Sequence, residues 1–266
     1  MIVSSDNGFF FVHIPKNGGS SVRDQIQPMD DTKGLFLGTK EHPELGVYDS
    51  SHVPLLWLQA HFGDWFDVIS GLEGFALLRD PVGRFASSTA QRFRQFKGKT
   101  PSDVTRAEIH AEIDEVIAHL TDCGRFPDSR MSHFMRQSEF VMLDGRRMVS
   151  HLYRLEDIDL LIGALARMSD TPLVTDFHSN KSFELRYRWI KGPLTASKDL
   201  AKKYLPNPVT DRLRRTAIRL LARQGDTDFG AVVSGSQEIR NFIETYYAED
   251  FTLFETTPPA KRTSAA

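Results

Sequence analysis

The sequence predicts an α/β protein in which a mostly parallel central sheet is flanked by helices on both faces. Two short, continuous apolar segments, residues 8–14 and 74–78, are typical of strands buried on both faces. A third strand is predicted at residues 149–154. Segments with helical periodicity lie between and after these strands, and such alternation favours a parallel sheet covered by helices on each side.

The composition is that of an ordinary globular chain. Hydrophobic residues make up 40% and charged residues 26% of the 266 residues, so a sizeable core can form. The formal net charge of −2 argues against a polycation that binds nucleic acid, and an anion site has to come from local clustering. We expect a single domain over residues 1–255 and a disordered tail over residues 256–266.

The sequence carries no signal for a membrane or a secretory route. Its one cysteine, Cys123, cannot form an internal disulfide, which suits a reducing compartment. No apolar stretch reaches the roughly 18 residues of a membrane span, and the first residues lack the pattern of a signal peptide. We therefore expect a cytoplasmic protein, and the oligomeric state stays open.

The other elements follow in chain order. Helical character begins at residues 22–26, directly after a glycine turn. Residues 28–54 show no clear periodicity and are expected to form a long surface excursion. Further helices are predicted at residues 82–96, 109–120, 129–137, 155–168, 211–223 and 236–248.

The first predicted strand leads into a turn that suits an anion. Gly18 and Gly19 let the backbone approach a ligand closely, and the helix that follows begins with free N–H groups. Lys16 adds a full positive charge. The whole turn consists of Lys16, Asn17, Gly18, Gly19, Ser20 and Ser21. The alternative is an ordinary strand–turn–helix junction. A Walker A loop is disfavoured, because its lysine follows the last glycine.

The second predicted strand ends in another candidate phosphate contact. Arg79 stands at its carboxyl end, where open α/β sheets bind ligands, and an arginine can donate a bidentate fork to a phosphate. Ser87, in the second turn of the next helix, adds a donor. The alternative for Arg79 is an ion pair with Asp80. From Arg79 to Arg106, seven Arg and Lys residues oppose two Asp, which fits either a solvated basic face or a surface that attracts a polyanion.

Both motifs, in this order, resemble the sulfotransferases that depend on 3′-phosphoadenosine 5′-phosphosulfate (PAPS). The closest likeness is to the membrane-tethered carbohydrate sulfotransferases of the Golgi and their soluble bacterial relatives. Residues 11–21 (FVHIPKNGGSS) resemble the 5′-phosphosulfate loop, and residues 78–87 (LRDPVGRFAS) resemble the 3′-phosphate site. Weaker likenesses occur at residues 153–157, 180–182 and 239–254. Asn17 and Ser20 depart from the family's more frequent threonines.

The resemblance implies a P-loop-like sulfotransferase fold and PAPS as the donor. An acceptor hydroxyl, expected to belong to a carbohydrate or another small molecule, attacks sulfur in line, and adenosine 3′,5′-bisphosphate (PAP) leaves. Lys16 and the N–H groups of residues 18–21 would meet the charge that develops on the leaving phosphate. Arg79 and Ser87 would hold the 3′-phosphate.

The acceptor hydroxyl also needs a general base. We expect His61 in this role, since members of the family often carry a histidine segment between the two donor motifs and a neutral imidazole suits proton removal. The alternative is a packed or surface histidine. His52 and Asp64 are further candidates, whereas His13 fits a structural role. No histidine or cysteine spacing indicates a metal site, and no metal is expected.

Two other functions stay open. A nucleotide-dependent phosphoryl-transfer enzyme on a P-loop-like scaffold would need magnesium and a Walker-type lysine. A catalytically silent module that binds anionic glycans would use the basic segment 79–106. The basic segment 177–191 is interpreted either as a lid over the nucleotide or as a hairpin without a ligand.

Overall fold

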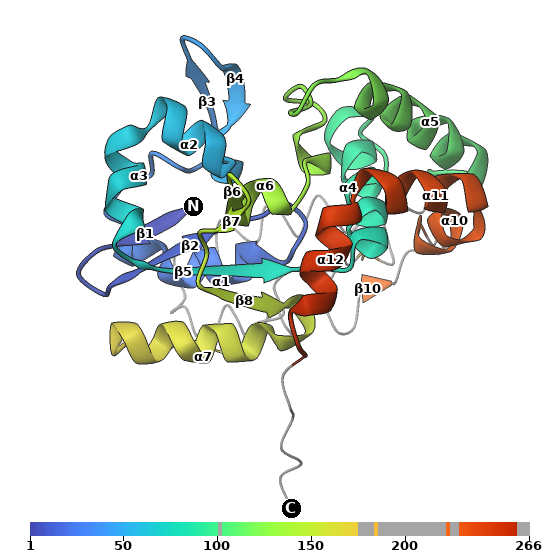
Figure 1. The fold of residues 1–266 in the computed structure, drawn as a ribbon. Coiled ribbons are helices and arrows are strands. Elements are labelled where there is room, and N and C mark those ends of the chain that lie inside the picture. The colour runs from blue at the N-terminus through green and yellow to red at the C-terminus, as the bar shows by residue number, and fades with distance from the viewer. Residues whose placement is uncertain (101–102, 175–183, 186–221, 224–228, 260–266) are drawn as a thin grey trace, which may run out of the picture.

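A computed structural model describes residues 1–100, 103–174, 184–185, 222–223 and 229–259 (Figure 1). Its central strands are β1 (Ile2–Ser4), β2 (Phe9–Val12), β5 (Glu73–Leu78) and β8 (His151–Arg154). Shorter strands form two-stranded pairs: β3 (Thr39–His42) with β4 (Gly46–Asp49), β6 (Met142–Leu143) with β7 (Arg146–Arg147), and β9 (Glu184–Leu185) with β10 (Ala222–Arg223). The described helices are α1 (Gly19–Ile26), α2 (Leu55–His61), α3 (Gly63–Ser70), α4 (Pro81–Phe96), α5 (Arg106–Asp122), α6 (Ser138–Val141), α7 (Ile158–Ser169), α10 (Phe229–Gly235), α11 (Gln237–Tyr246) and α12 (Ala248–Thr256).

The central sheet has the strand order β1-β2-β5-β8 and is mostly parallel, as the sequence predicts. β5 runs parallel to β2 on one side and to β8 on the other, and only the edge strand β1 is antiparallel. Phe75 is in register with Phe11 and with His151. Parallel strands end at the same edge of a sheet, so the turns after β2, β5 and β8 emerge together.

Helices cover both faces of this sheet, which confirms the layered α/β prediction. Alternate residues of a strand point to opposite faces, so Phe9, Phe11 and Phe75 pack with α1 and α7, while Phe10 and Val12 pack with α2 and α3. In Figure 1, α7 lies along one face of the sheet and α2 and α3 lie on the other. β2 is therefore buried on both faces, which explains its unbroken apolar sequence.

A separate helical core is built by α4, α5, α10 and α11 at the other end of the molecule (Figure 1). Phe85 and Phe93 of α4 are buried there with Ile113 of α5, Val233 of α10 and Ile243 of α11. α4 starts two residues after β5, so this helix joins the sheet to the helical core; Arg79 lies in the turn between them and Ser87 lies in α4.

Several helices begin or end at other residues than the sequence predicts. The helix predicted at 109–120 extends from Arg106 to Asp122, because Thr105 and Glu108 form a reciprocal capping box that adds a turn. The helix predicted at 129–137 is only a 3₁₀ turn, Ser132–Phe134, and the four-residue helix α6 follows. The one predicted at 155–168 begins as a 3₁₀ turn and continues as α7.

The excursion at residues 28–54 is more ordered than expected, since it contains the β3–β4 hairpin and buries Tyr48 in the core. The predicted tail also starts later, because Thr257 is buried and its carbonyl accepts a hydrogen bond from Arg154 Nε at 2.8 Å. Residues 211–221 and 260–266 lie outside the described part. Among the described helices, none combines the length and apolar character that a membrane crossing requires.

Candidate functional site

The turns after β2 and β5 touch each other, which the sequence-based hypothesis requires. Arg79 Nη1 donates to the carbonyl oxygen of Lys16 at 3.1 Å. Asn17 Nδ2 donates to the carbonyl oxygen of Leu77, the next-to-last residue of β5, at 2.6 Å. Because the strands are parallel neighbours, the cations of the two motifs, Lys16 and Arg79, belong to one site at one edge of the sheet.

Gln137 locks the two turns together. Its side-chain oxygen accepts from Asn17 Nδ2 at 2.6 Å and from the backbone N–H of Arg79 at 3.0 Å, and its Nε2 donates to the Arg79 carbonyl at 2.9 Å. Asp250 of α12 in turn accepts from the backbone N–H groups of Gln137 and Ser138 at 2.8 and 2.9 Å. Sequence reasoning missed Gln137, since no local motif marks a residue 120 positions from its partner Asn17.

The side chain of Asn17 therefore has a structural role and not the ligand-binding role that the sequence predicts. Its side chain is 1% exposed, and the amide donates to Leu77 and Gln137 rather than to a ligand. We correct its predicted role as a donor to the cofactor: the side chain of Asn17 holds the turn to β5. The amide oxygen of Asn17 is buried without a hydrogen-bond partner in the described structure.

The glycine turn at the start of α1 has a left-handed backbone and packs closely against neighbouring side chains. Lys16 and Gly18 have φ angles of 67° and 78°, in the left-handed region. A Cβ on Gly18 would lie 2.6 Å from Leu155 Cδ1, and one on Gly19 would lie 2.4 Å from His13 Cδ2, so both positions require glycine. Gly18 is the N-cap of α1 and supplies no side-chain acceptor, and the N–H of Ser21 donates to the carbonyl oxygen of Gly18 at 3.3 Å.

The serines of this turn differ in exposure. Ser20 is half-buried at the start of α1, and Ser21 is buried. The start of an α-helix carries a partial positive charge, which adds to that of Lys16. Backbone and side-chain donors of this turn can therefore converge on a single anionic group.

The cations at this edge are partly buried, and the carboxylates of Asp80 and Glu156 lie close enough to Arg79 to favour its charged form. The pKa of Lys16 is lowered to about 8 by burial and by the positive charges of Arg94, Arg79 and Arg84. Lys16 Nζ donates to the amide oxygen of Gln91 at 3.3 Å. In the described residues, neither Lys16 nor Arg79 forms an ion pair with an Asp or Glu side chain. Partly buried positive charge that forms no ion pair favours the binding of an anion.

Arg84 is a third cation near Lys16 and Arg79, and its role is structural. It is 1% exposed, and its guanidinium donates to the carbonyl oxygens of Pro15 at 3.1 Å, Met135 at 2.6 Å and His133 at 3.2 Å. Burial lowers the pKa of this guanidinium from its ordinary value. Arg84 thus fixes the backbone just before Lys16, and its side chain is fully engaged inside the protein.

The other residues of the second motif are arranged as follows. Asp80 caps α4, because its carboxylate accepts from the N–H of Gly83 at 2.7 Å, and it forms no ion pair with Arg79. Ser87 lies in the second turn of α4 and is half-buried. The neighbouring Ser88 is buried and donates to the His133 carbonyl at 2.9 Å. Ser87 is therefore the hydroxyl of this pair that remains accessible.

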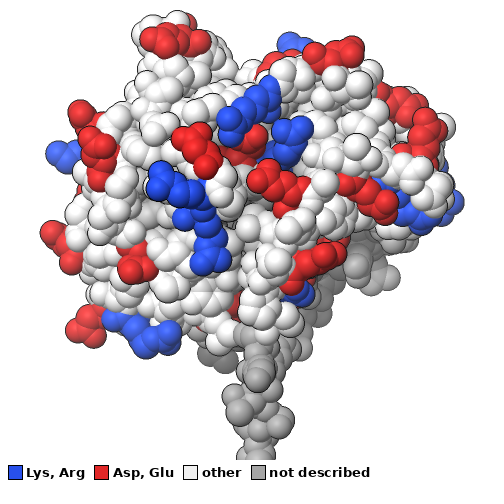
Figure 2. Space-filling model, in the orientation of Figure 1, with Lys and Arg blue, Asp and Glu red and all other residues white. Residues whose placement is uncertain are grey.

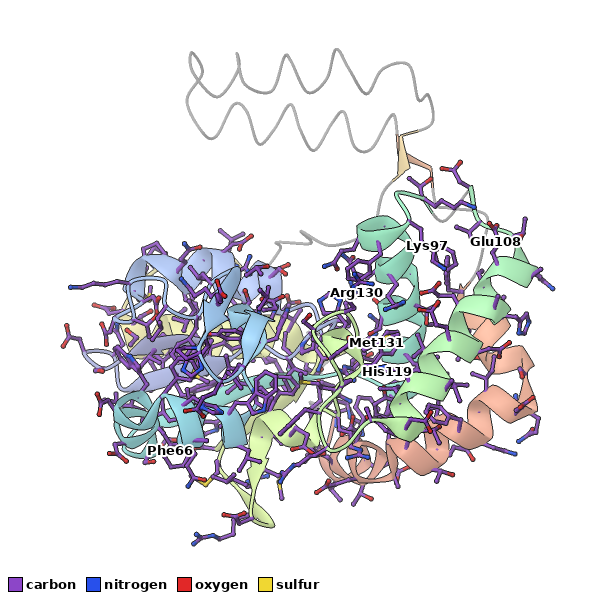
Figure 3. All side chains as sticks on the ribbon, turned by 90° about the horizontal axis from the view of Figure 1, so that it is seen from above. Phe66, Lys97, Glu108, His119, Arg130 and Met131 are labelled. Atoms are coloured by element: carbon purple, nitrogen blue, oxygen red, sulfur yellow. The ribbon has the colours of Figure 1, made fainter. Side chains whose placement is uncertain are left out.

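The basic excess from Arg79 to Arg106 is largely neutralised by α5. Arg92 pairs with Glu112 and Glu115, Lys97 pairs with Glu112, and Lys99 pairs with Glu108. Figure 3 shows Lys97 and Glu108 at the same end of the α4–α5 pair. On the face seen in Figure 2, acidic and basic side chains are interspersed. The segment is thus neither a free basic face nor a surface built for a polyanion.

No hydrogen bond, ion pair or ring contact joins His61 to Lys16 or Arg79 in the described residues. His61 ends α2, and its Nδ1 lies 3.3 Å from Oε2 of Glu44 in the β3–β4 turn. Its ring packs against that of His42 with centroids 5.1 Å apart. The described contacts of His61 therefore join α2 to the β3–β4 hairpin, and its role as general base stays a prediction. Asp64 is exposed in the first turn of α3.

Three other histidines gather beside the turn. His52 Nδ1 lies 2.6 Å from the carbonyl oxygen of His13, and the His52 ring is 4.5 Å from the ring of His13 and 5.7 Å from that of His133. A carbonyl oxygen can only accept, so Nδ1 of His52 carries the hydrogen and Nε2 keeps its lone pair. Burial lowers the pKa of His52 and of His133 to about 3, and Lys16 adds to the effect on His133. Both imidazoles are neutral at neutral pH.

His52 and His133 also form the one described group that could hold a metal ion. Together with Asp49 they place one ligand atom each within 4.8 Å of one another, an arrangement that the sequence spacing does not reveal. The positive charges of Lys16 and Arg84, which both act on His133, oppose a cation at this position. The donor set by itself fits a metal ion, but the local charge fits an anion, and we assign these histidines to proton transfer below.

Comparison of the chain with protein-family models, with curated proteins and with solved structures gives no match. The site is therefore defined by its own geometry: two cationic turns joined through Gln137 and a neutral histidine pair beside them. The basic segment 177–191, interpreted from the sequence as a lid or a hairpin, lies outside the described residues except for 184–185.

Proposed function

We propose that the protein is a PAPS-dependent sulfotransferase with a P-loop-like sulfotransferase fold, which transfers a sulfuryl group to an acceptor hydroxyl of a carbohydrate. One observation carries the proposal. Lys16 and Arg79, at the ends of adjacent parallel strands, form a partly buried cationic pair, and in the described structure neither makes an ion pair with a carboxylate, although Asp80 and Glu156 favour the charged form of Arg79. A doubly phosphorylated nucleotide supplies negative charge to both ends of such a site.

In this proposal each of the two turns binds one end of the sulfuryl donor PAPS. Lys16 and the N–H groups at the start of α1 bind the 5′-phosphosulfate, where negative charge grows on the bridging oxygen as the S–O bond to the nucleotide breaks. Arg79 and Ser87 bind the 3′-phosphate. The side chain of Asn17 is not among the groups that bind PAPS, because it already donates hydrogen bonds to Leu77 and Gln137.

His52 replaces His61 as the proposed general base. Its Nδ1–H donates to the His13 carbonyl, two residues before Pro15, and the basic Nε2 is left to accept a proton. The acceptor oxygen forms a bond to sulfur, its proton moves to His52 Nε2, and the electron pair of the broken S–O bond leaves with PAP. The bound donor is an anion next to this ring, and it raises the pKa of His52 from the low value of the free protein.

The two alternatives receive less support. A magnesium-dependent phosphoryl-transfer enzyme would need carboxylates at its phosphate site, and Asp80, the acidic residue next to Arg79, is used as a helix cap. A module for anionic glycans would need the segment 79–106 to be free, whereas Arg92, Lys97 and Lys99 are paired with α5.

Calorimetric titration with PAP tests the donor site. We expect binding by the wild-type protein, and a loss of about 2 kcal/mol, roughly thirtyfold in Kd, in the Arg79→Ala variant. Adenosine 5′-monophosphate lacks the 3′-phosphate, so its weaker binding should change little in the same variant. Arg146→Ala, which removes an exposed arginine of β7, is the matched control. Absence of PAP binding by folded protein would refute the proposal.

Transfer itself is measured with labelled PAPS and a mixture of hydroxylated acceptors. We expect the His52→Ala variant to bind PAP like wild type and to lose at least about a hundredfold in the rate of transfer. His61→Ala should keep its rate. A variant pair with the opposite outcome would restore His61 as the base and place the acceptor on the other side of α2.

A further inference from the structure

A cavity of about 400 Å³ opens next to the histidine pair, between the β3–β4 hairpin and the segment that follows α5. In Figure 1 this hairpin and that segment face each other at the top of the molecule. The size is in the range of small-molecule sites. His52 lines the cavity, so one end of it adjoins the base assigned above.

One wall of the cavity is apolar and aromatic. Trp57 of α2 and Phe126 line it with ring centroids 5.1 Å apart, and Tyr48 and Met135 contribute further apolar surface. A ring with an apolar face can pack against such a wall. An apolar wall alone does not distinguish a sugar from an aryl alcohol, and the polar lining decides between them.

The polar lining consists of hydrogen-bonding groups that are neutral or negative. Asp49 and Asp128 both line the cavity, each near a histidine: Asp49 Oδ2 lies 3.9 Å from His52 Nε2, and Asp128 Oδ2 lies 3.9 Å from His119 Nε2. Each carboxylate uses Oδ1 to accept backbone N–H groups, and in the described residues neither Oδ2 accepts a hydrogen bond. Two serines, Ser129 and Ser132, add hydroxyls.

No lysine or arginine is among the described residues that line this cavity. The described lining of the cavity thus carries carboxylates, Asp49 beside His52 and Asp128 beside His119, whereas the cations Lys16 and Arg79 lie outside it. A sulfate or carboxylate on the acceptor would meet Asp49 and Asp128 without a compensating cation, and that contact is unfavourable. Hydroxyl groups, in contrast, can donate to both carboxylate oxygens.

We infer that the acceptor is an uncharged saccharide, bound with one ring face on the Trp57–Phe126 wall and with its hydroxyls toward Asp49 and Asp128. This inference rests on the proposed sulfotransferase function and names its acceptor class. It excludes the acidic glycans that a cationic acceptor groove would take. It favours a sugar over an aryl alcohol because the carboxylates and serine hydroxyls that line the cavity offer more hydrogen-bonding groups than a phenol could satisfy.

Three matched probes separate the outcomes: phenyl β-glucoside, phenyl β-glucuronide and phenol. The first two differ only in a neutral hydroxymethyl group against a carboxylate, and phenol lacks the sugar. Each is titrated by calorimetry into protein that is saturated with PAP, so the readout does not depend on turnover. We expect the glucoside to bind at least about tenfold more tightly than the glucuronide and than phenol.

The double variant Asp49→Asn, Asp128→Asn tests the cause. It keeps hydrogen-bonding groups in the cavity and removes the negative charge, so we expect the glucuronide to gain affinity until the two glycosides differ by less than about threefold. Asp67→Asn, an exposed carboxylate on α3, is the control and should keep the tenfold difference.

Several results would overturn the inference while the donor site stands. They are equal or tighter binding of the glucuronide by wild type, binding of phenol as tight as that of the glucoside, an unchanged preference in the double variant, or no binding of any probe to the PAP complex. Failure of PAP itself to bind is a separate result, since it refutes the proposed function before any acceptor is added.

Discussion

Replacement of Lys16 by arginine should remove a pH dependence that the wild-type donor site has. The pKa of Lys16 is lowered to about 8 by burial and by the neighbouring arginines, so the free protein loses this positive charge as the pH rises through 8. A bound phosphate holds the lysine protonated, because the opposite charge favours the ammonium form. Proton uptake by Lys16 is thus linked to PAP binding above pH 8.

The size of the effect follows from the titration of the free protein. With a pKa of about 8, Lys16 is about 90% protonated at about pH 7 and about 10% protonated at about pH 9. If only protonated Lys16 binds the phosphosulfate end, the apparent Kd for PAP rises about tenfold between these pH values, equal to about 1.4 kcal/mol. The phosphates of PAP are fully ionised in this window, since their second pKa is about 6.

Calorimetric titrations with PAP at several pH values and constant ionic strength measure this dependence. In the Lys16→Arg variant the guanidinium stays charged throughout, so its Kd should change by less than about twofold. A wild-type Kd that is flat over this window, or the same rise in the variant, would show that Lys16 does not meet the anion. The geometry of the turn is not at issue, because both side chains carry a Cβ at the same left-handed position.

Four further predictions concern the free energy of unfolding and the requirement for a metal ion. Lys16→Met should abolish PAP binding and still raise the free energy of unfolding near neutral pH by about 1 kcal/mol in chemical denaturation, because a charge that burial disfavours is removed. Arg84→Met should lower it by about 3 kcal/mol, since the carbonyls of Pro15 and Met135 lose their donor, with Arg146→Met as the surface control. Gly18→Ala should cost about 2 kcal/mol through its φ of 78° and the contact with Leu155, measured in the same way. Sulfuryl transfer should persist in excess chelator, and loss of activity there would favour a metal-dependent phosphoryl transfer instead.

The parts of the fold that the sequence could predict are those with local signals. β2 and β5 are buried on both faces, so their composition alone marks them, and each is followed at once by the residues that form the cationic turn. The adjacency of the two turns follows from the parallel pairing that short strand–helix units impose. The sequence therefore predicts that Lys16 and Arg79 belong to one site.

The missed parts depend on contacts between distant residues. β3, with the sequence TKEH, is largely exposed and has no apolar alternation, so the hairpin at residues 39–49 carries no strand signal. Gln137 and His133 reach the site only because Arg84 and Asp250 anchor their backbone there. The choice between His61 and His52 depended on how that hairpin folds back, and local sequence does not encode this.

Because Asp250 lies near the end of the chain, the candidate site can be completed only late in synthesis. It holds the backbone of Gln137 and Ser138, and Gln137 in turn makes hydrogen bonds to both turns of the candidate site. The phosphate loop leaves the ribosome near the start of translation, but the anchor for its geometry is made about 230 residues later. A nascent or prematurely terminated chain therefore lacks the contacts that fix the two cationic turns, and we expect it not to bind the proposed nucleotide.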